Sequence, residues 1–461
     1  MHKSNAVTAP VPTGRVLRII FLTLFIDLIG FSIIFPLFPS MLVYYRETEG
    51  AGGLFGYFYG LLLRLSELAG PPDREWGSIV LFGGLLGSIY SLLQFLCAPL
   101  FGAISDRIGR KPVLLVSMTG IFISYVLWFF AGNFALLVFS RFIGGIMSAN
   151  ISTATAIVAD ITDEKTRSRG MAIIGIAFGL GFILGPAIGG FSSLLKLHEL
   201  LPALVPFGVN PYSAPAGIAL LLSLINIVQV ASRLPETRPE HAREAALSTQ
   251  RSVNPFVLLH AESYPGVTRT NWTYFLFMLA FSGMEFSLTF LAVDRLNYTP
   301  KENTYIFLFV GVVLAAVQGS YVQRFSHRVG NKRMSIQGLA LVLPGFALIG
   351  GAGHAQNSLL LYAGLFFLAA GAAQATPCLT ALVSMYTPAH DQGRTVGVFR
   401  SLGALARALG PLVASLMYWR VGADVAYYLG AASIILPLAL ALGLPPLPLR
   451  AQPVTGRTQG G

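Results

Sequence analysis

The sequence predicts an all-α integral membrane protein whose twelve transmembrane helices form two pseudo-symmetric six-helix bundles. Hydrophobic residues make up 54% of the 461 positions and charged residues only 11%, so one water-soluble core could not bury the apolar side chains. Apolar runs of about 20 residues recur, and a helix of that length crosses about 30 Å of hydrocarbon. A membrane β-barrel is not favoured, because segments of about ten residues with alternating polarity do not recur.

The apolar runs give the order of the elements. The first run carries Asp27 and is too long for the core of a signal peptide, so we expect a retained helix. The spans are expected at residues 16–39, 76–102, 112–132, 134–159, 170–191, 213–233, 271–294, 303–323, 334–353, 358–386, 395–419 and 423–445. The predicted domains are an N-terminal segment (1–15), a first bundle (16–233), a linker (234–270), a second bundle (271–445) and a C-terminal tail (446–461).

The distribution of positive charge predicts the orientation. Most of the 31 Lys and Arg residues fall in the termini and the even-numbered links, so the positive-inside rule places both termini and the linker in the cytoplasm. The cations are scattered over short links instead of one face, so we expect lipid and not nucleic acid as a partner. We recognise no address signal, which leaves the plasma membrane and an endomembrane both open.

The two halves repeat one another. TDEKTRSRG, starting at Thr162, precedes LGP at 184–186, and TPAHDQGRT, starting at Thr387, precedes LGP at 409–411. Parallel repeats of this kind place a substrate site between the halves near the membrane midplane. In the long external loop at 40–75, the segment FGYFYGLLLRL is either an interfacial helix or an ordered spacer without a role in transport.

A charged motif, GAISDRIGRKP at 102–112, joins the second and third spans. Gly102 and Gly109 allow close backbone approach and a tight turn. Its charged residues are Asp106, Arg107, Arg110 and Lys111, and Asp160 is a candidate partner for Arg107 or Arg110. Such pairs can form a cytoplasmic latch between the bundles, although an ordinary positive-inside loop is the alternative. The second half repeats the pattern with Arg328, Gly330 and Lys332, but His327 stands where the first half has Asp106.

Ionisable residues deep in the spans are the first candidates for a site, because each is costly in hydrocarbon. They are Asp27, Arg141, Glu285, Arg400 and Arg407. Arg400 and Arg407 are seven residues apart and share one helix face. Three cations against two acids leave one positive charge in surplus, which an anionic substrate would balance. Alternatively, the five residues pair among themselves and only fix helix register.

Polar amides and small residues add further candidates. Gln94 is expected to bridge helices, whereas Asn150 and Gln374 could either bridge or contact substrate. The fifth span carries Gly175 and Gly179 and then a motif that predicts close packing and a deformable point. The residues of that motif are Gly181, Gly185, Pro186, Gly189 and Gly190.

No reaction chemistry is visible in the sequence. We find no phosphate loop, no metal-spaced His and Cys cluster and no Ser/His/Asp grouping, so we expect neither an enzyme nor a metal or cofactor. Cys97 and Cys378 both fall within spans and indicate no disulfide framework. Asn297 begins a glycosylation pattern, but it lies too close to the seventh span for glycosylation to be expected. Energy for transport would come from a gradient.

The chain resembles the major facilitator superfamily. GAISDRIGRKP matches its loop signature, and IDLIGFSIIFPLFP is similar to the first-helix pattern of its drug:proton antiporter branch. SRFIGG, with Arg141 and Gly144, and GFILGPAIGG at 181–190 resemble its helix 4 and helix 5 motifs. The segments LFGGLLGSIYSLLQFLCAPL, TAIVADI and FRSLGALARALGPLVA are similar to the eukaryotic tetracycline-transporter-like proteins, which are regarded as organic anion exporters.

The resemblance implies the major facilitator fold and a secondary active transporter. Such a protein would export organic anions or amphipathic drugs by alternating access, in exchange for protons, and we expect a monomer. The resemblance also implies a part for Arg141 in proton coupling, within reach of Asp27. A receptor or assembly partner without turnover, a facilitative uniporter and a symporter are the alternatives, and the sequence names neither the substrate nor the coupling ion.

Overall fold

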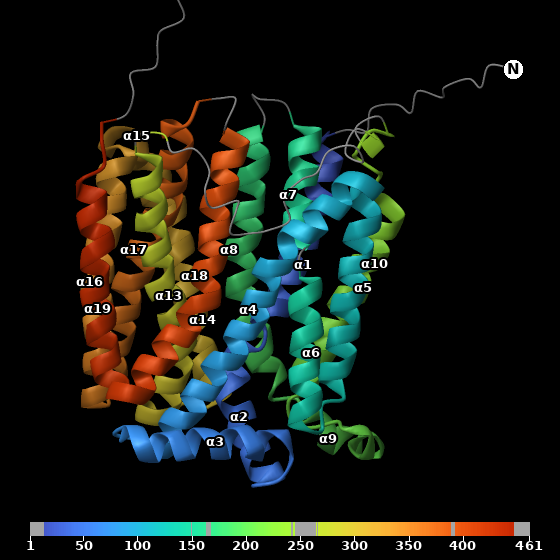
Figure 1. Cartoon of the computed structure of the whole chain (residues 1–461), viewed down its shortest axis with the longest axis vertical. Coiled ribbons are helices and arrows are strands. Elements are labelled where there is room, and N and C mark those ends of the chain that lie inside the picture. The colour runs from blue at the N-terminus through green and yellow to red at the C-terminus, as the bar shows by residue number, and fades with distance from the viewer. Residues whose placement is uncertain are drawn as a thin grey trace, which may run out of the picture.

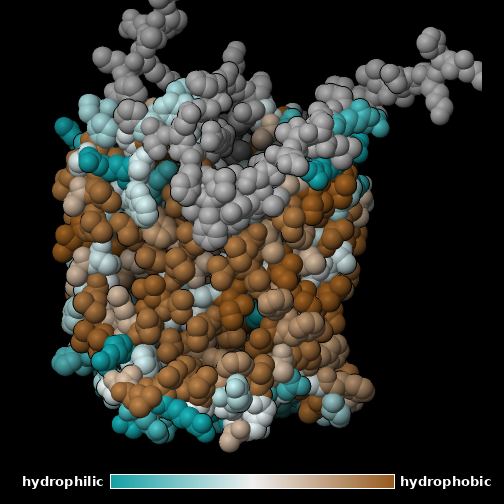
Figure 2. Space-filling view, in the orientation of Figure 1, coloured by the Kyte–Doolittle hydropathy of each residue, from teal (hydrophilic) through white to brown (hydrophobic). Residues whose placement is uncertain are grey.

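The computed structural model describes residues 13–148, 150–162, 167–240, 243–244, 264, 266–388 and 392–446. Within these residues all regular structure is helical, and twelve spans are long and apolar enough to cross a membrane. The long helices run between two opposite ends of the molecule (Figure 1). On the face seen in Figure 2, apolar side chains make up most of the surface between those ends. The predicted fold class is therefore confirmed.

The first half contains six spans. The elements are α1 (Thr13–Ser32), η1 (Phe35–Leu37), α2 (Phe38–Glu49), α3 (Gly53–Ala69), α4 (Arg74–Ile108), α5 (Arg110–Phe129), α6 (Phe134–Met147), α7 (Asn150–Ile161), α8 (Arg167–Ser192), α9 (Leu197–Leu200), η2 (Pro202–Phe207) and α10 (Ser213–Arg233). The first span combines α1, η1 and α2, and the fourth combines α6 and α7. The short helix α3 lies across one end of the spans (Figure 1).

The second half contains the other six spans. The elements are α13 (Val267–Leu296), α14 (Pro300–Ala316), the π-helical η3 (Val317–Val322), α15 (Gln323–Val329), α16 (Asn331–Ala355), α17 (Ser358–Tyr386), α18 (Gln392–Val421) and α19 (Ala423–Leu442). We call the end of the molecule where α1 begins and α19 ends the proximal end, and the opposite end, where α3 lies, the distal end (Figure 1).

Corresponding turns in the two halves have the same geometry. Gly109 and Gly330 separate the second and third spans of their halves, and both have positive φ, at 113° and 84°. After each turn a lysine amine donates a hydrogen bond to a carbonyl near the end of the last span of its own half. Lys111 donates to Ala231, and Lys332 donates to Leu444. The repeat in the sequence is thus a repeat in local structure.

Two helix ends differ from the prediction by more than five residues. The first span continues to Glu49 instead of ending at residue 39, because Pro36 and Pro39 each stand in the first turn of a new helical segment. A proline there lacks only an N–H that would have no helical partner. The second span continues to Ile108 instead of 102, so the charged motif is not a loop but two helix ends joined at Gly109.

Small residues bring the two halves together at the distal end. A Cβ atom at Gly84 of α4 would overlap the side chain of Ser415 in α18, and one at Gly190 of α8 would overlap Thr304 in α14. Aromatic rings add to this contact, since Phe38 and Phe286 lie 6.0 Å apart between ring centroids. The two halves are therefore in close contact on the distal side, which is closed in this structure.

Candidate functional site

Asp27 is held by two amides from different helices. Its Oδ1 accepts a hydrogen bond of 3.1 Å from Asn226 of α10, and its Oδ2 accepts one from Asn150 of α7. Asn226 also donates to the Thr23 carbonyl at 3.1 Å. Asn150 thus bonds the acid directly. Asn226 was missed in the sequence, although an amide within the apolar run of α10 satisfies the same criterion as Asn150.

Arg141 lies against aromatic rings. Its guanidinium carbon is 4.6 Å from the centre of the Trp128 ring, which is a cation–π distance. It is only 9% exposed, and its Nη2 has no hydrogen-bond partner among the described residues. Tyr125 interacts electrostatically with both Arg141 and Asp27. Within the described residues the two charges form no ion pair, and Tyr90, like Tyr125, interacts electrostatically with both.

Gly30 accounts for the glycine that follows Asp27 by three residues in the first-helix pattern. It stands three residues after Asp27, on nearly the same helix face. A Cβ atom at Gly30 would overlap the hydroxyl of Tyr125. Only glycine therefore lets this hydroxyl approach α1 beside the acid.

The second half supplies the other deep charges. Glu285 of α13 and Arg407 of α18 are partly buried and interact electrostatically, but they form no ion pair within 4.0 Å in the described part of the chain. Arg400, also on α18, donates a 3.4 Å hydrogen bond to the Thr155 hydroxyl of α7, in the other half. Beside it the rings of Tyr274 and Phe399 stack at 3.9 Å. The described residues therefore show no direct ion pair among the five deep charges.

The other two predicted amides pack helices together. Gln374 donates to the Ala370 carbonyl of its own helix at 3.0 Å, and its Cβ lies against Gly338 of α16. Gln94 donates to the Ser148 carbonyl at 3.1 Å and so joins α4 to the end of α6. The geometry gives Gln374 a role in helix packing and gives Gln94 the bridging contact that was expected.

The glycine motif of α8 packs mainly on α1. Cβ atoms at Gly181, Gly185 and Gly189 would overlap α1 or the residue after it. Gly190 instead faces α14 of the second half, so this stretch of α8, with Pro186 inside the helix, contacts both halves. Among the described residues, no atom lies within 4 Å of a Cβ added at Gly175 or Gly179, so the close packing begins at Gly181.

The charged motif at the proximal end forms a buried cluster. Arg110 is 4% exposed and makes ion pairs of 2.8 Å with both Asp106 and Asp160. Arg238, just after α10, lies 3.9 Å from Asp106 and 3.5 Å from Asp160. The carboxylate of Glu236 accepts the backbone N–H groups at the start of α5, where a helix terminus favours negative charge. Arg110 is thus buried, whereas the sequence suggested pairs at the surface.

These contacts lie within the first half. The pairs named above join α4 and α5 to α7 and to the segment after α10, and Arg107 is exposed. Asp160 therefore takes Arg110 rather than Arg107 as its partner. Glu236 and Arg238 were missed because the sequence does not show that the start of the linker folds back on the motif. The side chain of His327, in the second-half counterpart, lies outside the described residues.

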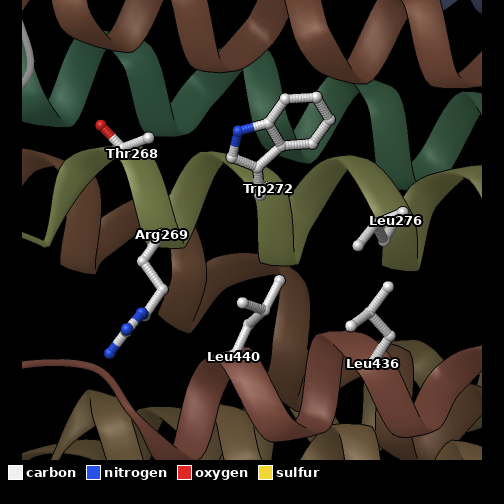
Figure 3. Close-up of a pocket in the computed structure, with 6 residues that line it drawn as sticks. All are labelled: Thr268, Arg269, Trp272, Leu276, Leu436 and Leu440. Atoms are coloured by element: carbon white, nitrogen blue, oxygen red, sulfur yellow. The ribbon is translucent and has the colours of Figure 1, made fainter.

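A surface groove of about 570 Å³ lies away from these charges. It runs between α13 and α19 (Figure 3). Its lining residues are Thr268, Arg269, Trp272, Leu276, Leu436 and Leu440. None of the predicted site residues lines it, so the candidate site is the set of interior charges and their amide and aromatic neighbours.

Comparisons with known proteins agree with the fold described above. The sequence model of the Major Facilitator Superfamily matches residues 20–411 and 321–459. Major facilitator superfamily domain-containing protein 10 of Mus musculus is 37% identical over 450 residues, covering 94% of this chain and 93% of that protein. The class C tetracycline resistance protein of Escherichia coli is 26% identical over 407 residues, covering 88% of this chain and 90% of that protein.

The solved structures that are similar to this chain are also those of transporters. The crystal structure of the human organic anion transporter MFSD10 (TETRAN) is similar with a TM-score of 0.72 at 34% identity, covering 94% of this chain and 100% of that chain. A D-xylose-proton symporter is similar with a TM-score of 0.70 at 14% identity, covering 94% and 98%, which is a likeness of fold alone.

The buried cluster predicts a stability difference between two arginines of one motif. Arg110→Ala removes a cation that pairs at 2.8 Å with both Asp106 and Asp160, whose side chains are only 13% exposed, and should cost about 3 kcal/mol of unfolding free energy. Arg107→Ala, on an exposed side chain, should cost under about 0.5 kcal/mol. Thermal unfolding of the purified variants measures both effects, and adding Asp160→Asn to Arg110→Ala should recover part of the loss. Equal melting temperatures for the two single variants would contradict the assignment.

Proposed function

Because the chain belongs to the major facilitator superfamily, we propose that this transporter is a secondary active exporter of organic anions that exchanges them for protons. The observation that carries the proposal is the pair Arg400 and Arg407 on the interior of α18. Within the described residues neither guanidinium forms an ion pair with an acid, and Arg407 makes no hydrogen bond. Ionisable side chains inside a membrane are costly, and they commonly mark substrate or ion pathways.

The charge balance favours an anion. Three interior cations face two interior acids, and Arg407 interacts with Glu285 without a direct ion pair. A guanidinium binds a carboxylate or sulfonate through two parallel charge-assisted hydrogen bonds. Arg400, which already reaches Thr155 across the two halves, would bring such a ligand into contact with both bundles. The human relative described as an organic anion transporter supports the same substrate class.

Asp27 and Glu285 are the candidates for proton carriage. Among the described residues Asp27 is bonded by amides and not by an arginine, so it can gain or lose a proton without breaking an ion pair. Tyr125 links Asp27 electrostatically to Arg141, which gives a path by which protonation of Asp27 affects the first half.

With the termini in the cytoplasm, the closed distal side faces outward, as expected for an exporter that awaits substrate from inside.

A second substrate class has its own support. The tetracycline resistance relatives and the stacked rings of Tyr274 and Phe399 beside Arg400 favour amphipathic aromatic drugs. An aromatic acid would satisfy both the rings and the arginines. The substrate panel for the assays below should therefore include aromatic anions and their neutral amides.

Asp27→Asn should abolish accumulation driven by a pH gradient while retaining substrate exchange, because exchange needs no net proton movement. Asparagine keeps the size of the side chain and can still bond the neighbouring amides. Uptake and counterflow in liposomes measure the two activities, with Glu67→Gln on exposed α3 as the control and Glu285→Gln as the parallel variant. Full accumulation by both neutral interior variants would exclude both acids as coupling sites.

Arg407→Lys should raise the apparent KM for organic anions about tenfold, because lysine keeps the charge but not the planar fork; tenfold corresponds to about 1.4 kcal/mol. Arg269→Lys, in the surface groove between α13 and α19, is the matched control and should leave KM unchanged. Concentration-dependent uptake in liposomes measures both values.

Arg407→Ala should abolish anion transport. If it also lowers stability, adding Glu285→Gln should restore stability without restoring transport, since the acid then no longer needs a cation. Normal anion transport by the double variant would make Arg407 a structural residue and remove the support for an anionic substrate.

A further inference from the structure

Helix α3 is attached to the first half at the distal end. Its Phe55 ring packs on Phe82 of α4 and Phe134 of α6, at centroid distances of 5.2 and 5.1 Å. The Tyr59 hydroxyl donates to the Glu75 carbonyl at 3.3 Å, beside the short turn that leads into α4. The helix crosses the ends of the spans instead of running along them (Figure 1).

The surface of α3 is divided into three faces. Phe55, Leu62 and Ser66 are buried against the bundle. Successive helical residues turn by about 100°, so five exposed apolar side chains fall within a second arc of about 100°. They are Tyr57, Phe58, Leu61, Leu65 and Leu68. The third face carries Gly56, Gly60, Arg64 and Glu67.

This division suits the boundary between membrane and water. A helix in that position needs one face on the protein, one on acyl chains and one in water. The aromatic side chains Tyr57 and Phe58 on the apolar face match the residues that concentrate at such boundaries. Lipid of the distal leaflet is therefore the partner that fits the exposed apolar face.

The far end of α3 is bonded to the second half. The indole N–H of Trp419 donates to the Ser66 hydroxyl at 2.8 Å, and the Arg420 guanidinium donates to the Ala69 carbonyl at 2.6 Å. Ser66 is fully buried, and its hydroxyl also lies 2.9 Å from that of Ser78 in α4. An arginine at a helix C-terminus satisfies a carbonyl that has no helical partner.

We propose that α3 is a lipid-bound clasp that holds the distal side of the two halves shut. Helix α3 is packed on the first half and moves with it, whereas Trp419 and Arg420 stand in the last turn of α18 in the second half. Alternating access requires the halves to part at this end, so both bonds must break in each cycle. The apolar face keeps α3 in the plane of the leaflet, where Ser66 and Ala69 meet their partners.

The lipid contact is tested with spin labels on the full-length protein in liposomes of phosphatidylcholine. Labels are attached through Leu61→Cys on the apolar face and Arg64→Cys on the polar face, after replacement of Cys97 and Cys378. The Leu61 label should collide more with oxygen, and the Arg64 label more with a water-soluble nickel complex. Equal exposure of both labels to the nickel complex overturns the lipid assignment.

The clasp is tested by the reactivity of a buried distal position. Ser415→Cys lies against Gly84 where the halves meet, and a membrane-impermeant thiol reagent reaches it only when the distal side opens. Trp419→Phe with Arg420→Met removes both bonds and should raise the modification rate about tenfold, which corresponds to about 1.4 kcal/mol. Arg420→Met alone should give a smaller increase, and an unchanged rate in both variants overturns the clasp.

Two double variants on α3 test whether its contact with lipid supports the clasp. Leu61→Ser with Leu65→Ser weakens the apolar face and should also speed modification at Ser415→Cys severalfold. Arg64→Ser with Glu67→Ser changes the water face of the same helix and should leave the rate as it was. Equal rates for these two pairs would show that lipid does not support the clasp.

Discussion

The structure depends on one constraint, which is that hydrocarbon offers no hydrogen-bond partner to a polar group. The backbone meets this constraint by forming helices, and each polar side chain inside must find its partner in the protein. Asp27 finds two asparagines, and Arg141 finds the Trp128 ring. Arg407 has neither an ion pair nor a hydrogen bond among the described residues. An interior cation without a described partner is therefore the best indicator of a substrate that carries negative charge.

The same constraint shapes the contacts between helices. Lipid is as apolar as the side chains that face it, so helices gain little by burying apolar surface and depend on close approach. Gly84 and Gly190 supply that approach between the halves, and Gly181, Gly185 and Gly189 supply it between α8 and α1. Because α1 carries Asp27, the glycine-rich helix connects the acid to the surface where the halves meet. Asp27 and the distal contact between the halves are thus joined by one packed helix.

Much of the fold was predictable because the signal is local. The spans follow from apolar runs, and the deep charges are visible because each interrupts such a run. Their partners were not predictable, since Asp27 and Asn226 meet across 199 positions of sequence. The burial of Arg110 depends likewise on Asp160 of α7 and on Arg238 after α10, which only the tertiary structure brings to the end of α4. A motif that looks like a surface loop in the sequence is therefore a buried cluster in the fold.

The central claim is that interior arginines and acids couple the export of an organic anion to a proton gradient. The most direct test is uptake of labelled organic anions and matched organic cations by the purified wild-type protein in sealed liposomes, with an imposed pH gradient. The account predicts that anions accumulate against their gradient only when protons can flow in the opposite direction, and that the matched cations do not accumulate. Accumulation of cations instead of anions, or anion flux that is indifferent to the pH gradient, would contradict it.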